Sequence, residues 1–152
     1  MDKKFSAFIE IAKALNKYSI VPILYGSLGL YRIVGQLDKV NDIDITIPNK
    51  NLVDKFDELM KIMAEIGYRQ DARYPHEFTK GEGQIGFEPE SDLVELGINI
   101  EALKTTVIDG IKFKELASQD YLKVYQRNLK TWEKKVENIK AKIKALEKLN
   151  SS

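Results

Sequence analysis

The segment DIDITIP, residues 42 to 48, constrains the fold of this chain more than any other. Polar and apolar residues alternate strictly along it, and its final proline ends the pattern. Successive side chains of a β-strand point to opposite faces of a sheet, so the alternation predicts a strand with one buried and one open face. The buried face would carry the three isoleucines, Ile43, Ile45 and Ile47. The open face would carry the polar residues, Asp42, Asp44 and Thr46.

A pair of small residues lies upstream of this strand. The apolar run SIVPILY, residues 19 to 25, predicts a short strand, and Gly26 and Ser27 close it before helical spacing resumes up to Gly35. The pair therefore stands where a strand gives way to a helix. Backbone N–H groups at a helix N-terminus can bind phosphate, and glycine lets the backbone approach it closely. This turn is a candidate phosphate site.

The open face of the strand is a candidate metal site. Asp42 and Asp44 are two residues apart, which puts their Cα atoms about 6.6 to 6.8 Å apart on a strand. Their carboxylates can converge on one ion, or on two ions about 3.5 to 4 Å apart as in phosphoryl transfer. The chain has no cysteine and one histidine, which excludes disulfides, thiolate zinc sites and a cysteine nucleophile. A metal would be held mainly by carboxylates, which suits Mg²⁺ or Mn²⁺.

The motifs YGS, residues 25 to 27, and NDIDI, residues 41 to 45, together resemble those of the nucleotidyltransferase superfamily. That superfamily includes DNA polymerase beta, antibiotic nucleotidyltransferases and the minimal nucleotidyltransferases of prokaryotes. The resemblance implies an α+β fold with a small mixed β-sheet flanked by helices. It also implies transfer of a nucleoside monophosphate, dependent on Mg²⁺ or Mn²⁺, from an NTP, with ATP expected, to a hydroxyl of a small molecule or a protein.

The resemblance assigns roles to individual residues. By motif position, the triphosphate would be held by Gly26 and Ser27. The metal would be held by Asp42 and Asp44. The family places a third carboxylate on a neighbouring strand, where it helps to bind the metal and can take the proton of the attacking hydroxyl. Our candidate for this carboxylate is Glu88.

Glu88 is chosen from the strand pattern of QIGFEP, residues 84 to 89. Ile85 and Phe87 would face the core, which leaves Glu88 on the same open face as the two aspartates. A register shift of one residue would exchange the two faces, so other acids nearby remain alternatives. These are Asp92 and Glu95, and the absence of a third carboxylate is the remaining alternative.

The last part of the chain predicts a long C-terminal helix. Apolar residues recur there every three or four positions and form a heptad seam, which comprises Leu122, Tyr125, Leu129, Trp132, Val136, Ile139, Ile143 and Leu146. We expect residues 1 to 116 to form the nucleotidyltransferase-like domain and the helix, residues 117 to 149, to pack on it. Packing on a partner is the alternative, either a second copy of the chain in a homodimer or a toxin.

Charge is unevenly distributed along the chain. Residues 120 to 149 carry nine Lys and Arg against four acids, whereas residues 81 to 103 carry six acids and no Lys or Arg. We interpret the basic residues as a solvated face that comprises Lys123, Arg127 and Lys130, with contact to a triphosphate as the alternative. Arg32 is a further phosphate candidate. His76 is interpreted as a surface or strand-edge residue, with a catalytic base as the alternative. The aromatic residues of the helix fall mainly on the apolar seam, so nucleic-acid binding is not expected.

Length and hydropathy bound the class of protein. At 152 residues the chain suits one domain. No apolar run approaches the roughly 20 residues of a membrane span, and the N-terminal segment lacks the apolar core of a signal peptide, so we expect a cytoplasmic protein. The alternative to an active enzyme is a catalytically weak nucleotide-binding module or an antitoxin-type regulatory module.

Overall fold

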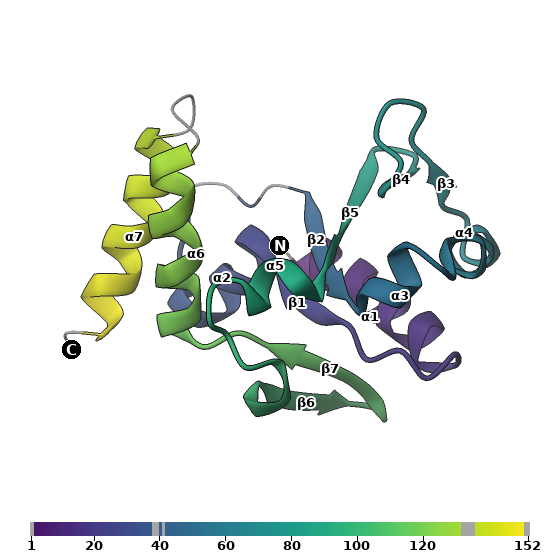
Figure 1. Cartoon of the computed structure of the whole chain (residues 1–152), viewed down its shortest axis with the longest axis horizontal. Coiled ribbons are helices and arrows are strands. Elements are labelled where there is room, and N and C mark those ends of the chain that lie inside the picture. The colour runs from purple at the N-terminus through teal and green to yellow at the C-terminus, as the bar shows by residue number, and fades with distance from the viewer. Residues whose placement is uncertain (1, 38–39, 41, 132–135, 151–152) are drawn as a thin grey trace.

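The computed structural model describes residues 2–37, 40, 42–131 and 136–150 (Figure 1). Its centre is one seven-stranded mixed sheet with the order β3-β4-β5-β2-β1-β7-β6. The strands are β1 (Ile23–Tyr25), β2 (Ile43–Ile47), β3 (Arg69–Gln70), β4 (Glu77–Lys80), β5 (Gly83–Pro89), β6 (Lys104–Ile108) and β7 (Ile111–Glu115). β2 pairs in parallel with β5 and antiparallel with β1, so the strand of the DIDITIP motif lies in the middle of the sheet.

Helices flank this sheet. They are α1 (Asp2–Asn16), α2 (Gly26–Val34), α3 (Asn49–Leu52), α4 (Phe56–Glu65), α5 (Glu90–Val94), α6 (Ser118–Thr131) and α7 (Val136–Asn150), with a short 3₁₀ helix at Ile100–Ala102. None of the helices in the described part of the chain combines the length and apolarity that a membrane span requires. The predicted α+β class, with a mixed sheet flanked by helices, is confirmed.

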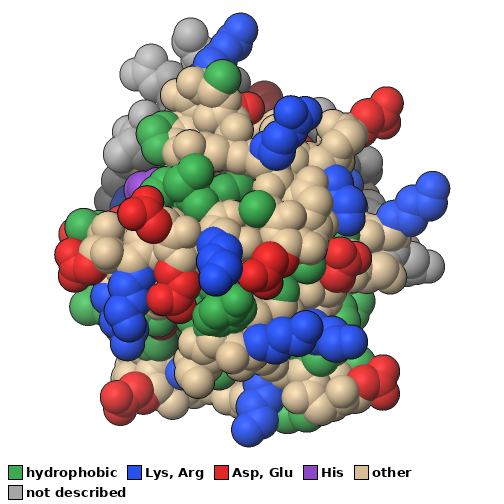
Figure 2. All heavy atoms as spheres, turned by 90° about the vertical axis from the view of Figure 1, so that its right-hand side faces the viewer, with side chains coloured by type: hydrophobic (Ala, Val, Ile, Leu, Met, Phe, Trp, Pro, Cys, Tyr) green, Lys and Arg blue, Asp and Glu red, His purple; other side chains and the backbone are tan. Residues whose placement is uncertain are grey.

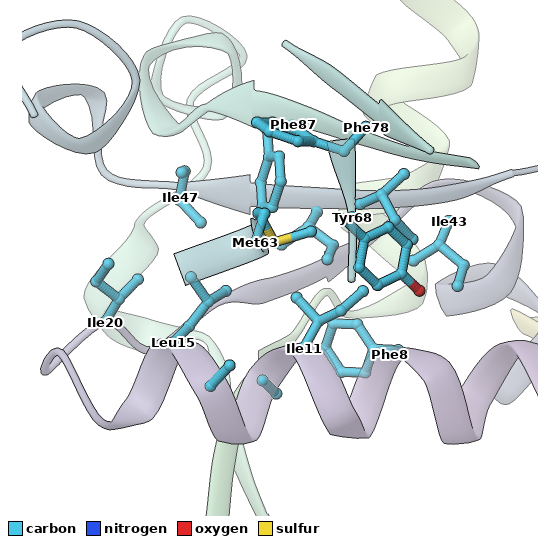
Figure 3. Close-up of a cluster of buried hydrophobic side chains, with 14 of the residues drawn as sticks. Phe8, Ile11, Leu15, Ile20, Ile43, Ile47, Met63, Tyr68, Phe78 and Phe87 are labelled. Carbon is cyan, nitrogen blue, oxygen red and sulfur yellow. The ribbon is translucent and has the colours of Figure 1, made fainter. Parts of the chain in front are cut away.

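α1 and α4 cover the face of the sheet that carries the β2 isoleucines. As the alternation predicted, all three are buried there: Ile43, Ile45 and Ile47. The side chains that α1 presents to them are Phe8, Ile11 and Leu15 (Figure 3). Each such side chain contributes about 1.5 to 3 kcal/mol relative to an exposed position. This packing fixes which face of β2 remains for polar residues.

A second buried cluster joins β1 and α2 to the two C-terminal helices, through Ile23, Leu30, Tyr121, Ile139 and Leu146. Tyr121 of α6 is buried, and its hydroxyl donates a hydrogen bond to the Leu24 carbonyl oxygen, 3.4 Å away. The same hydroxyl lies against Gly29 of α2, where a β-carbon would collide with it. The glycine in the first turn of α2 therefore lets α6 approach the sheet closely.

The C-terminal segment is helical, as predicted. The heptad seam predicted one long helix, however, and the structure has two, α6 and α7. α6 and α7 lie side by side (Figure 1). Tyr125, Ile139 and Leu146 of the seam are buried in one apolar cluster. In a helical hairpin the two halves of the seam pack against each other, whereas one straight helix would leave much of it without a partner. Trp132 of the seam lies outside the described residues.

Candidate active site

The Gly-Ser turn and Asp44 meet at the start of α2. β1 ends at Tyr25, which pairs with Asp44 of β2, and α2 begins at the next residue, Gly26. Gly26 has a φ of +67°, a left-handed conformation that favours glycine. A β-carbon at this position would occupy the space that the Asp44 carboxylate fills. Asp44 therefore lies against the N-terminal end of α2, at the turn that also holds the buried Ser27.

A cavity of about 370 Å³ opens at this turn. The sheet and the Gly-Ser turn line it with Tyr25, Gly26, Ser27, Asp44, Thr46 and Glu88. The remaining polar lining is Asp92 of α5 and, from the helical hairpin, Arg127, Asn128, Asn138 and Lys142. Acidic and basic side chains are interspersed over the face of the molecule in Figure 2. In the cavity, in contrast, acids come from the sheet and α5, and cations come from the hairpin, an arrangement that suits a polyphosphate with its metal ion.

Four of the five predicted site residues line this cavity together: Gly26, Ser27, Asp44 and Glu88. Asp42 lies just before β2, is exposed, and lines a separate hollow beside Lys4 and Tyr68. Of the alternative acids, Asp92 lines the cavity and Glu95 does not. That these residues bind metal or triphosphate stays a prediction.

Glu88 lies close to two other acidic side chains of the cavity, Asp92 and Asp44. Burial and then the charges of Asp92 and Asp44 raise the pKa of Glu88 from 4.5 to about 7. The strand register explains part of this crowding, because Glu88 of β5 stands opposite Thr46, one step along the open face from Asp44. Glu88 is thus able to exchange a proton near neutral pH.

Thr46 also lines the cavity, and the alternation of residues 42 to 48 predicted its place on the open face without indicating a role for it. Its side chain is 1% exposed, and its Oγ1 has no hydrogen-bond partner in the described part of the chain. An unsatisfied buried hydroxyl costs about 1 to 3 kcal/mol. The hydroxyl therefore stands ready for a ligand in the cavity.

The sequence predicted only one of the two cationic side chains that line the cavity, Arg127 and Lys142. Arg127 was expected on a solvated face, with contact to a triphosphate as the alternative, and it lines the cavity. Lys142 of α7 was missed: it is 9% exposed, and its Nζ lies 5.1 Å from the centroid of the Tyr125 ring. On one continuous helix, Lys142 would lie about 22 Å along the axis from Arg127, at about 1.5 Å per residue. Only the hairpin brings them to one cavity.

Arg32 does not line the cavity in the described structure. Its Nε donates a 2.8 Å hydrogen bond to a Glu115 carboxylate oxygen, and a second guanidinium nitrogen donates one of 3.2 Å to the other oxygen. The guanidinium also stacks 4.3 Å from the centroid of the Phe5 ring. Through these contacts, Arg32 links α2 to β7.

A second hollow, of about 320 Å³, adjoins the first. Asp44 and Glu88 line both. The remaining lining of the second hollow is Tyr74, Pro75, His76, Glu77, Gly86 and Phe87. His76 is exposed, as expected, and its ring lies 5.7 Å from that of Phe56. The two acids thus stand where two hollows meet, a suitable place for the reacting groups of two substrates.

The fold family implies a divalent metal ion, and the donor atoms of the cavity suit one. Mg²⁺ takes oxygen ligands and is commonly held by one or two carboxylates together with substrate phosphates. Asp44 and Glu88 supply two carboxylates, and the unpartnered hydroxyl of Thr46 adds a third oxygen. Among the residues that the structure describes, no three His, Asp or Glu side chains stand close enough to hold a metal by themselves.

No protein-family model matches the chain. A crystal structure of ANT(2'')-Ia in complex with adenylyl-2''-tobramycin is similar over 96% of this chain and 92% of that chain, with a TM-score of 0.60 and 15% identity. A crystal structure of an antigenic nucleotidyltransferase-like protein from Paracoccidioides brasiliensis is similar over 96% of this chain and 76% of that chain, with a TM-score of 0.67 and 12% identity. The chain therefore has the nucleotidyltransferase fold, which confirms the resemblance based on YGS and NDIDI.

In sequence, the chain is 37% identical over 129 residues to the uncharacterized protein YnaI of Bacillus subtilis (strain 168). The match covers 84% of this chain and 83% of that protein. The chain belongs to the family of YnaI.

Proposed function

We propose that this protein is a metal-dependent nucleotidyltransferase that moves a nucleoside monophosphate from an NTP to a hydroxyl group. The observation that supports this most is the meeting of the Gly-Ser turn with Asp44 and Glu88 in one cavity. A phosphate-binding turn and two metal-binding carboxylates are the minimum that nucleotidyl transfer requires. The nucleotidyltransferase fold of the chain supports the same assignment.

The triphosphate would lie between the start of α2 and the helical hairpin. Ser27 and the first backbone N–H groups of α2 provide hydrogen-bond donors at the positive end of a helix. Arg127 and Lys142 line the same cavity. A guanidinium binds phosphate oxygens in pairs, and a lysine ammonium adds a point charge. These groups would orient the α-phosphate toward Asp44 and Glu88.

Asp44 and Glu88 would hold Mg²⁺ or Mn²⁺, with Thr46 beside them. Asp42 stays a predicted ligand, since its exposed side chain directly precedes the strand that carries Asp44. When bound, the ion neutralises charge on the phosphates and makes the α-phosphorus easier to attack.

The second hollow would admit the acceptor. The acceptor oxygen would bond to the α-phosphorus, and the bond between that phosphorus and pyrophosphate would break. The proton of the acceptor hydroxyl would pass to Glu88, whose side chain lines both hollows. One fold neighbour was solved with adenylyl-2''-tobramycin, a small molecule that carries an adenylyl group. This favours ATP as the nucleotide and a small-molecule hydroxyl as the acceptor.

A second candidate is a nucleotide-binding regulatory module without efficient transfer, including an antitoxin that acts on a toxin partner. One observation favours it. β5 places Gly86, which has no side chain, directly opposite Asp44 in the register of the two strands. A site with fewer carboxylates on the catalytic metal would bind a nucleotide yet transfer it slowly.

The test is incubation of the protein with α-labelled NTPs, Mg²⁺ and a panel of hydroxyl-bearing small molecules and proteins. Transfer of label to an acceptor supports the enzyme, and the transfer should be lost in Asp44→Asn and Glu88→Gln variants that keep the wild-type fold. Transfer that is unchanged in both variants would contradict the site. Nucleotide binding without transfer to any acceptor would favour the regulatory module.

A further inference from the structure

Tyr74 carries the only hydroxyl group among the described residues that line the second hollow. Asp44 and Glu88, the two acids proposed to act in the transfer, line the same hollow. The proposed reaction needs a hydroxyl acceptor, and this hollow is the place proposed for it. The chain itself therefore supplies, at that place, one group of the kind that the reaction consumes.

Tyr74 is also the one exposed tyrosine. All seven tyrosines of the chain lie among the described residues, and the other six are buried or half-buried. Tyr74, in contrast, is 57% exposed. A tyrosine ring stabilises a fold mainly through the area that it buries, so packing explains little of this residue. Its exposure leaves the hydroxyl accessible to a nucleotide.

Hydrogen bonds hold the backbone at Tyr74, which lies in the segment 71–76 between β3 and β4. A carboxylate oxygen of Asp71 accepts hydrogen bonds from the backbone N–H groups of Arg73, at 2.8 Å, and of Tyr74, at 3.2 Å. The Tyr74 carbonyl oxygen accepts one of 3.0 Å from the Glu77 N–H. The proline that follows Tyr74 restricts its backbone further. A nucleophile held beside the reacting groups loses little freedom when it attacks.

We propose that Tyr74 is a site of self-modification, at which the protein transfers a nucleoside monophosphate to its own phenol oxygen. This inference rests on the proposed nucleotidyltransferase function and names a protein hydroxyl as one acceptor. The Tyr74 Oη would bond to the α-phosphorus of the NTP, and the bond between that phosphorus and pyrophosphate would break. The phenol proton would pass to Glu88.

The products of this step are a tyrosyl phosphodiester and pyrophosphate, so the reaction needs no reactant besides the NTP. The attached nucleotide would then occupy the hollow that otherwise admits an external acceptor.

The test incubates the full chain with α-labelled NTPs and Mg²⁺, without any other acceptor, and locates the label by mass spectrometry of peptides. The label should lie on Tyr74. It should be lost in Tyr74→Phe, which removes only the hydroxyl, and in Asp44→Asn. Tyr18→Phe is the matched control and should be labelled like the wild type, because the Tyr18 hydroxyl donates a 3.4 Å hydrogen bond to Glu65 and lines neither hollow. Circular dichroism and thermal unfolding would show that each variant keeps the fold.

The chemistry of the labelled bond distinguishes Tyr74 from the other nucleophiles of the hollow, which are His76 and the carboxylates of Asp44, Glu77 and Glu88. A nucleotide on the histidine ring would be a phosphoramidate, which acid cleaves. A nucleotide on a carboxylate would be a mixed anhydride, which hydroxylamine cleaves. A tyrosyl phosphodiester should survive both treatments, and label that either treatment removes would contradict the proposal.

The shared hollow predicts transfer within one chain. In a mixture of untagged wild type and affinity-tagged Asp44→Asn, label should appear only on the wild-type chain. Label on the tagged chain would mean that the tyrosine of one copy reacts at the acids of another, which would overturn the placement of Tyr74 in its own hollow.

Failure of this inference is separable from failure of the proposed function. Transfer to an external hydroxyl compound by a wild type that stays unlabelled would reject self-modification and keep the enzyme. Self-labelling that persists in Tyr74→Phe would also reject Tyr74 as the site and keep the enzyme. Absence of label from the protein and from every external acceptor would reject both.

Discussion

The carboxylate of Asp44 occupies the space that a side chain at Gly26 would fill, so the strand proposed to bind metal and the turn proposed to bind phosphate are in direct contact. No intervening side chain separates them. A metal ion at Asp44 would therefore stand beside the first turn of α2, where the backbone N–H groups and Ser27 can bind the phosphates of the same nucleotide.

Gly26→Ala should lower both stability and nucleotide affinity. Its left-handed φ of +67° alone should cost about 1 to 2 kcal/mol in the free energy of unfolding. The collision with Asp44 would add to that cost. Gly35→Ala is the matched control at the other end of α2, because Gly35 has a φ of +76° with open space around it. Urea unfolding and ATP calorimetry should show similar backbone strain in both variants and a loss of ATP affinity in Gly26→Ala only.

Glu88 should make the metal-free protein less stable as the pH rises. Its pKa is about 7 in the folded chain and near 4.5 when unfolded, so between those values the folded state holds a proton that the unfolded state has lost. The free energy of unfolding therefore falls from pH 4.5 to pH 7, by roughly 1 kcal/mol after allowance for solvent screening of a partly exposed group. The crowding comes from Asp92 on α5, Asp44 on β2 and Glu77 on β4.

Urea unfolding at pH 5 and pH 8 without metal would measure this fall. Glu88→Gln should remove it, whereas Glu95→Gln, at an exposed position outside the cavity, should keep the wild-type difference. A Glu88→Gln profile that parallels the wild type would mean that Glu88 does not carry the raised pKa.

Lys142→Gln should weaken ATP binding while it leaves the fold intact. Lys142 is nearly buried and lines the cavity, so its ammonium would meet a triphosphate there with little solvent screening. We expect a loss of about tenfold, as for one charge-assisted hydrogen bond. Lys144→Gln alters an exposed lysine on the same helix and is the control. Equal ATP affinities of the two variants would contradict the placement of the triphosphate.

Leu146→Ala should destabilise a single chain rather than dissociate a dimer. Leu146 is fully buried in the cluster shared by α6 and α7, so its truncation should cost about 2 to 5 kcal/mol. Because Tyr125, Ile139 and Leu146 of the seam are buried within the chain, the melting temperature of both proteins should not depend on protein concentration. A wild-type melting temperature that rises with concentration would instead show that the chain associates.

The sequence predicted those features of the fold and site that depend on the residue pattern of a single segment. Ile43, Ile45 and Ile47 alternate with polar residues, so the buried face of β2 and the open position of Asp44 followed from periodicity alone. Gly26 and Ser27 stood between a strand pattern and a helix pattern, which placed them at the start of α2.

The sequence was uninformative wherever the site depends on pairing between distant segments. The heptad spacing is the same in one long helix and in a helical hairpin. It therefore could not predict that Lys142 of α7 and Arg127 of α6 line the same cavity. The face of Glu88 was predictable from its own strand. The position of Gly86 opposite Asp44, with Glu77 beyond it, depends on the register of β2, β5 and β4, which no single strand encodes.

The most direct test of the central claim is a crystal structure of the protein with Mn²⁺ and a non-hydrolysable ATP analogue. We predict an anomalous Mn²⁺ signal within about 2.0 to 2.4 Å of carboxylate oxygens of Asp44 and Glu88, with the triphosphate against Ser27 and the first turn of α2. A triphosphate bound elsewhere, or one bound at α2 with no ion at Asp44, would contradict the account.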